Sequence, residues 1–165
     1  MSLMHQLNYN QKLSRQFPVP AYRVIYPKSA MYCTAAIVSN EDYKEAVIDQ
    51  QLYWGHAATL DEARYLSAVL NAPVVTAEVR KMQPRGEHNP RDIAKYVFKL
   101  AIPTFQPNEA SHRDLVRLAA TAEQVATAVN LPQVKFEAQR TRIRHALEEN
   151  GIAQDIDAIV STFLQ

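Results

Sequence analysis

Apolar residues recur at steps of three and four in residues 59–75, and this spacing predicts an amphipathic helix. Thr59 and Glu62 stand three residues apart at its start, the spacing of a capping box that satisfies free backbone N–H groups. The predicted core-facing stripe consists of Leu66, Val69, Leu70 and Pro73. Asn71 can adopt the left-handed conformation of a helix end, and Pro73 interrupts the helix. We expect a short helix and, directly after it, a second apolar segment that continues to about residue 82.

Stretches rich in β-branched and aromatic residues predict strands on both sides of this helix. They cover residues 22–26, 34–38, 46–48 and 51–54 before it and residues 99–103 after it. From residue 108 onwards the spacing is helical, with an apolar seam from Leu115 to Val129 and two further helices over residues 136–150 and 152–163. The predicted fold class is α+β, with a small mixed sheet, short helices and a C-terminal helical tail.

The same pattern divides the chain into three regions. Residues 1–20 are polar and end in two prolines separated by one residue, which favours an extended N-terminal linker. Residues 21–107 form the predicted α+β body, and residues 108–165 form the helical tail. A length of 165 residues is sufficient for a globular domain with a hydrophobic core.

The net charge is only +1, from 18 basic and 17 acidic residues, so it demands neither nucleic acid nor a membrane as partner. The distribution says more, because basic stretches at residues 1–28 and 78–99 flank an acidic stretch at residues 41–64. Cys33 is the only cysteine, which excludes an internal disulfide and fits a reducing cytoplasm. No apolar run approaches the roughly 20 residues of a membrane span, so we expect a cytoplasmic protein without a membrane partner.

Groups that could carry catalysis are scattered along the chain. Only three glycines are present and no two are close, whereas a phosphate-binding loop needs clustered glycines. The five histidines include no pair at helical spacing, and there is no cysteine pair for zinc. Asp49, Glu78 and Lys81 could form a metal-dependent nuclease site, although acids at such spacing also arise by chance. The prediction is a protein that is not an enzyme and binds no cofactor or metal.

Five segments carry a resemblance to a known family. Residues 62–66 read Glu-Ala-Arg-Tyr-Leu and residues 70–73 read Leu-Asn-Ala-Pro, near the two ends of the predicted helix. Residues 91–93, Arg-Asp-Ile, and the Ile-Pro dipeptide at 102–103 follow, and the tail from Arg140 to Val160 completes the series. In order and spacing, these segments resemble the C-terminal region of adenine-specific DNA methyltransferases of restriction–modification systems. The resemblance extends over residues 22–165.

The resemblance implies recognition of a DNA target rather than methyl transfer. In that family, an S-adenosylmethionine-binding domain with an Asn-Pro-Pro-Tyr or Asn-Pro-Pro-Phe motif acts on a flipped adenine. This sequence has neither a Pro-Pro pair nor a glycine-rich cofactor loop, so it departs from the family by lacking the catalytic half. We expect either part of a longer protein or a chain that helps position double-stranded DNA for a separate methyltransferase catalytic domain or subunit.

The residues expected to contact DNA lie in two places. Lysine and arginine bind phosphates, and arginine, asparagine and glutamine read base edges. The stretch after the predicted helix combines such side chains with a glycine that permits close approach of the backbone: Arg80, Lys81, Gln83, Arg85, Gly86, His88, Asn89, Arg91 and Lys95. The turn between the first two strands adds Lys28 and Ser29. For Arg91 the alternative is a structural ion pair with Asp92.

The alternative function is a helical protein-interaction module. The seam from Leu115 to Val129 and the arginine-rich residues 140–144 could dock a partner subunit without direct contact to DNA. The nearly neutral net charge favours this alternative, because single DNA-binding domains are often clearly basic. Tyr53 and Trp54 lie inside an apolar strand and are expected in the core rather than on a base-stacking surface. Salt distinguishes the two functions, since phosphate contacts weaken steeply as salt is added.

Overall fold

The computed structural model describes residues 5, 6, 8–83, 92–133 and 135–164. Its sheet has three strands, β1 (Tyr22–Pro27), β2 (Ala36–Ser39) and β3 (Leu52–Ala57), in the order β2-β1-β3. Val24 of β1 pairs with Ile37 on one side and with Gly55 on the other, and both pairings are antiparallel. The predicted α+β class is confirmed, and the sheet in the described part of the chain is antiparallel rather than mixed.

Two predicted strands are wrong because their backbone groups have other partners. Residues 46–48 form no strand: the Ile48 N–H donates to the Gln16 side-chain oxygen, and the Ile48 carbonyl accepts from the Gln16 amide nitrogen, each at 2.8 Å. Residues 99–103 also form no strand. The Lys99 N–H donates to the Tyr96 carbonyl at 3.0 Å and so belongs to a turn. Residue composition favours a strand only where a sheet edge is available to pair with.

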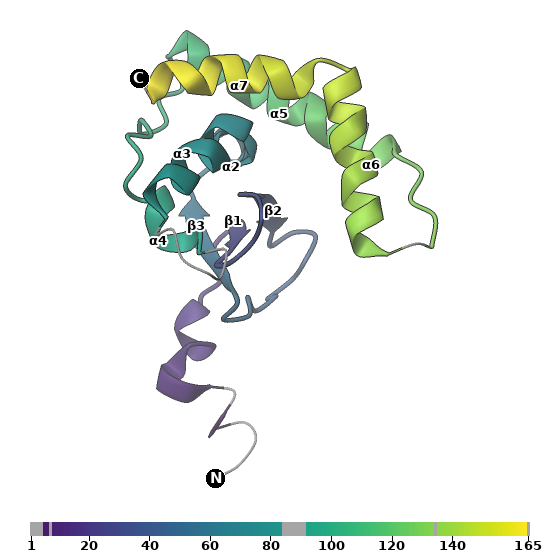
Figure 1. Ribbon diagram of the computed structural model, residues 1–165. Helices are drawn as coiled ribbons and strands as arrows, with labels where there is room; N and C mark the ends of the chain where they lie inside the picture. Colours follow the sequence, from purple (N-terminus) through teal and green to yellow (C-terminus); the bar gives the residue numbers. More distant parts are fainter. Residues whose placement is uncertain (1–4, 7, 84–91, 134, 165) are drawn as a thin grey trace.

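Helices α2 (Leu60–Asn71) and α3 (Pro73–Met82) follow β3, and α2 covers one face of the sheet (Figure 1). The predicted capping box is confirmed. Thr59 Oγ1 accepts from the Glu62 N–H at 3.1 Å, and the Glu62 carboxylate accepts from the Ala58 N–H at 2.7 Å. The predicted left-handed end at Asn71 is wrong: Asn71 stays helical, and the extended Ala72 (φ −61°, ψ 131°) separates the two helices.

The core-facing side of α2 differs in part from the predicted stripe. Val69 and Leu70 are buried as predicted, whereas Leu66 is only half-buried and Pro73 is exposed. Tyr65 lies outside the predicted stripe and is completely buried. Its hydroxyl donates to the Pro103 carbonyl at 2.8 Å, and a phenol with an acceptor can be buried without leaving its O–H unpaired.

The helical tail is confirmed as α5 (Ala110–Ala128), α6 (Phe136–Glu149) and α7 (Ile152–Phe163). Leu115 of α5 and Val160 of α7 are completely buried, and both join Val69 of α2 in one hydrophobic cluster. Body and tail thus share a core. α5 and α7 lie together across α2 and α3, while α6 extends away from them as an arm (Figure 1). This α6 arm has no buried residue. The short α4 (Ala94–Val97) lies beside α3.

The N-terminal region is not the extended linker that its prolines predict. It contains two turns of 3-10 helix, η1 (Tyr9–Gln11) and η2 (Ser14–Gln16). Asn8 Oδ1 accepts the backbone N–H groups of Leu13 and Ser14, each at 3.1 Å. Short polar side chains of this kind stabilise turns by bonding to nearby backbone. Among the helices in the described part of the chain, none is both long and apolar enough to cross a membrane.

Candidate nucleic-acid interface

A basic surface lies around residues 28–35, the segment between β1 and β2. The Cys33 N–H donates to Thr76 Oγ1 at 3.0 Å. Ala35 exchanges two hydrogen bonds with the Asn71 side chain: its N–H donates to Oδ1 at 3.1 Å, and its carbonyl accepts from Nδ2 at 2.9 Å. Asn71 belongs to α2 and Thr76 to α3, so the helices of the core fix the position of this segment.

Lys28 and Ser29, at the start of this segment, lie beside Asp92 and Ile93, which belong to the described end of the other region predicted to contact DNA. Ser29 forms an antiparallel bridge with Asp92, and the Ile93 N–H donates to the Lys28 carbonyl at 2.8 Å. Gln83 Nε2 donates to the Asp92 carbonyl at 2.7 Å, so Gln83 has a structural role. Five of the predicted contact residues lie outside the described residues: Arg85, Gly86, His88, Asn89 and Arg91.

Two arginines from different helices lie over one aromatic ring further along the segment. Arg80 of α3 donates from Nη2 to the Met31 carbonyl at 2.7 Å, and its guanidinium carbon is 5.4 Å from the centre of the Tyr32 ring. The guanidinium carbon of Arg144, in α6, is 4.7 Å from the same centre. Attraction between a cation and a π face therefore links α3, α6 and this segment at Tyr32.

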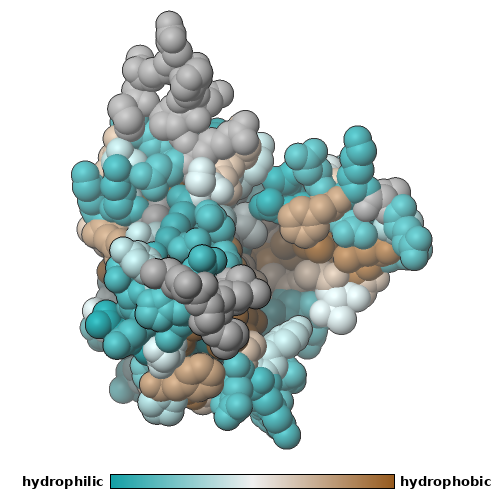
Figure 2. Space-filling model, turned by 90° about the horizontal axis from the view of Figure 1, so that it is seen from below, coloured by the Kyte–Doolittle hydropathy of each residue, from teal (hydrophilic) through white to brown (hydrophobic). Residues whose placement is uncertain are grey.

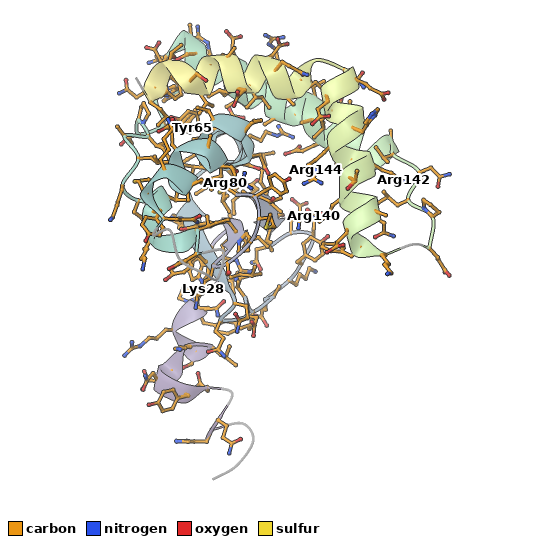
Figure 3. The ribbon with its side chains drawn as sticks, viewed as in Figure 1. Lys28, Tyr65, Arg80, Arg140, Arg142 and Arg144 are labelled. Atoms are coloured by element: carbon orange, nitrogen blue, oxygen red, sulfur yellow. The ribbon has the colours of Figure 1, made fainter. Side chains whose placement is uncertain are left out.

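Arg140 connects the α6 arm to the same segment. Its Nη2 donates to Thr34 Oγ1 at 2.9 Å, and its guanidinium carbon is 5.6 Å from the ring centre of Phe136, one helical turn earlier. Arg140 and Arg144 point from α6 toward the body, while Arg142 points away from it (Figure 3). We call the resulting surface the basic strip; it consists of Lys28, Tyr32, Arg80, Arg140 and Arg144.

None of the cations in the basic strip has a carboxylate partner among the described residues. Two other predicted contact residues differ in this respect, because Lys81 pairs with Glu78 and Lys95 pairs with Asp92 at 3.3 Å. Both pairs are at least partly exposed to solvent, so they contribute about 0–1 kcal/mol each. The strip therefore presents positive charge that no described acidic group compensates, whereas the charges of Lys81 and Lys95 are partly neutralised.

Aromatic rings lie exposed among these cations. Tyr32 is 44% exposed and Phe136 is 70% exposed. Tyr53 is 39% exposed, with the Lys28 ammonium 5.2 Å from its ring centre, so the prediction that Tyr53 belongs to the core is wrong. The surface is hollowed between the body and the α6 arm, and hydrophobic side chains line part of the arm (Figure 2). Cations interleaved with exposed rings are typical of surfaces that bind nucleic acids.

Sequence reasoning identified Lys28 and Arg80 and missed the other members of the strip as DNA contacts. The only signal for Arg140 and Arg144 is their spacing of four, which places both side chains on one face of a helix. Nothing local indicates what that face meets, because the Arg140–Thr34 contact joins residues 106 positions apart. Tyr32 carries no local signal of its role either, since the arginines over it come from α3 and α6.

Cys33, Tyr65 and Arg23 are buried ionisable residues outside the basic strip. Burial raises the pKa of the Cys33 thiol to about 12, which keeps it protonated and unreactive. Burial also raises the pKa of Tyr65 to about 12. Arg23 is completely buried, which lowers its pKa; Nη2 donates to the Ala46 carbonyl at 2.6 Å, while Nε and Nη1 have no described partner. Within the described ranges, no group of three or more His, Cys, Asp or Glu side chains could hold a metal ion.

Comparison of the chain with protein-family models gave no match, and neither did comparison with curated proteins or with solved structures. The resemblance to DNA methyltransferases therefore stays a prediction. Three properties of the basic strip suggest a binding function: cations without a described carboxylate partner, exposed aromatic rings in and beside the strip, and a backbone fixed by the core.

Proposed function

We propose that the chain is a non-catalytic DNA-binding domain that holds double-stranded DNA on the basic strip and positions it for a methyltransferase catalytic domain or subunit. The observation that carries the proposal is the set of cations around residues 28–35, none of which has a carboxylate partner among the described residues. The methyltransferase part of the proposal is supported by the sequence resemblance alone.

The arrangement of the arginines suits phosphate groups. Arg80 and Arg140 each donate one hydrogen bond from Nη2 to the 28–35 segment, which fixes the guanidinium group. A guanidinium has five N–H donors, so a bond at one nitrogen leaves donors for a phosphate. Prior fixation of the side chain also reduces the conformational entropy lost on binding. Arg144 lies over the same Tyr32 ring as Arg80, and Lys28 lies at the start of the 28–35 segment.

The test is the salt dependence of binding to a fluorescently labelled duplex, measured by anisotropy. Each lost phosphate contact lowers the slope of log affinity against log salt concentration by about 0.9. The Arg80→Ala, Arg140→Ala, Arg144→Ala triple variant is therefore expected to lose about 2.7 units of slope and most of its affinity. An equal loss of charge outside the strip provides the control: Arg113→Ala, Arg117→Ala, Arg142→Ala.

Both triple variants remove three positive charges, so a general effect of net charge would weaken them equally. The control residues are exposed on α5 and on the outward side of α6. Equal slopes for the two variants, or a wild-type chain that does not bind duplex DNA at 50 mM salt, would show that the basic strip is not a DNA-binding surface.

A second function, docking of a partner protein, is favoured by one observation. The α6 arm has no buried residue and exposes Phe136, so the part of its surface around Phe136 can pack against another protein. The other half of this alternative is not supported, because Leu115 and Ala119 of the apolar seam are buried in the chain's own core. Binding to the methyltransferase subunit that changes little with salt and is lost in Phe136→Ala would favour docking.

A further inference from the structure

Contacts between cations and aromatic rings recur in this chain. The described residues contain seven of them, with the cation between 4.7 and 5.8 Å from the ring centre. One is internal, because Arg23 is completely buried. Three others lie at the basic strip: two at the Tyr32 ring and one at the Phe136 ring, beside Arg140. The phosphates of a duplex require only the cations, so the exposed rings need a separate explanation.

Phe136 is the most informative of these rings. It lies in the first turn of α6 and is 70% exposed, so it contributes little to the core. Arg140 lies beside it, and the hydrogen bond from Arg140 to Thr34 places this pair next to the 28–35 segment. Tyr32, with Arg80 and Arg144 over its ring, belongs to the same segment. Two exposed rings and three arginines, contributed by α3, α6 and the 28–35 segment, therefore contact one another on one surface.

We propose that this surface binds single-stranded DNA, with an unpaired base stacked on the Phe136 ring and the adjoining phosphates held by Arg140, Arg144 and Arg80. This inference rests on the proposed DNA binding and specifies the form of DNA that the α6 end of the strip takes. In a duplex both faces of each base are covered by its neighbours, so an aromatic ring on the protein surface has no base to stack on. In a single strand the base faces are accessible, and stacking adds to the electrostatic attraction.

The experiment measures anisotropy of a labelled oligodeoxythymidine of twelve nucleotides and of a labelled duplex, at the same salt concentration. Loss of base–aromatic stacking lowers affinity by about fivefold to about 150-fold. Phe136→Ala is expected to lower single-strand affinity within this range and to leave duplex affinity unchanged. Phe136→Tyr, which keeps the ring, is expected to retain single-strand binding. Tyr9→Ala removes another exposed ring (62% exposed), from η1 in the N-terminal region, and is expected to change neither affinity.

Each outcome decides something different. Single-strand affinity that is unchanged in Phe136→Ala, with duplex binding still dependent on the arginines, overturns this inference and leaves the proposed function intact. Absence of binding to both DNA forms overturns both proposals. Single-strand binding that is lost in Phe136→Ala and retained in Phe136→Tyr supports the inference, even if the duplex does not bind. Since Phe136 is exposed, a circular dichroism melt is expected to show all three variants folded.

Discussion

The core around α2 and the α6 arm are both helical, yet different interactions hold them. Tyr65, Leu115 and Val160 are completely buried in one cluster formed by α2, α5 and α7. The α6 arm has no buried residue and reaches the 28–35 segment through Arg140 and Arg144. Burial of a large apolar side chain contributes about 1.5–3 kcal/mol, whereas an exposed polar contact contributes far less. Side chains on α6 are therefore less constrained by folding and more available for binding.

The largest expected effect tests the core half of this comparison. Leu115→Ala is expected to lower the free energy of unfolding by about 2–5 kcal/mol, because it leaves a cavity between α5 and its neighbours. Leu131→Ala is the matched control: Leu131 lies between α5 and α6 and is 41% exposed, so its removal leaves no closed cavity. Urea denaturation gives both values. Equal losses for the two variants would show that burial does not separate these regions.

The next effect concerns the link between core and basic strip. Asn71→Ala removes both hydrogen bonds to Ala35 and is expected to cost about 1–3 kcal/mol, because two backbone groups lose their partner. It should also weaken DNA binding, since residues 28–35 then lose a contact that holds them on α2. Ser67→Ala is the control, as it removes only the 3.3 Å bond between Asn71 Nδ2 and Ser67 Oγ. Asn71→Ala with unaltered DNA affinity would mean that the core does not position the strip.

Features of the fold that depend on nearby residues could be predicted from the sequence. The start of α2 follows from Thr59 and Glu62, which satisfy backbone N–H groups within one turn. The predicted stripe did not include Tyr65, and the acceptor that allows its hydroxyl to be buried belongs to Pro103, 38 positions away. The strand at residues 46–48 was mispredicted because its hydrogen-bond partner is Gln16, 32 positions earlier.

In the candidate site, too, features that depend on nearby residues could be predicted, and contacts between distant residues could not. Lys28 and Arg80 could be found from local charge, and the bridge between Ser29 and Asp92 brings their two regions together. The α6 arginines belong to the site only because the tail returns to residues 28–35, and the sequence contains no local pattern for that contact. The sequence also could not show that Arg80 and Lys81 differ in their ion pairing. In the structure, Lys81 pairs with Glu78 and Arg80 does not.

The smallest effects on stability are expected at surface arginines, and they separate folding from binding. Arg64 of α2 pairs with Glu123 of α5, with 2.9 Å between Arg64 Nη2 and Glu123 Oε2. Both side chains are partly exposed, so Arg64→Ala is expected to cost about 0–1 kcal/mol, less at high salt. A double-mutant cycle with Glu123→Ala measures the pair itself.

Arg144→Ala is the comparison for Arg64→Ala, because it also removes one arginine that contacts a second element of the fold. It is expected to change stability no more than Arg64→Ala does, since Arg144 is exposed and its ring contact with Tyr32 lies at the surface. The two variants should differ in DNA binding: Arg144→Ala lowers the salt slope by about 0.9, and Arg64→Ala leaves it unchanged. If Arg144→Ala instead destabilised the chain as much as Leu115→Ala, the α6 arm would be part of the folding unit, and its arginines would be explained by structure rather than by DNA.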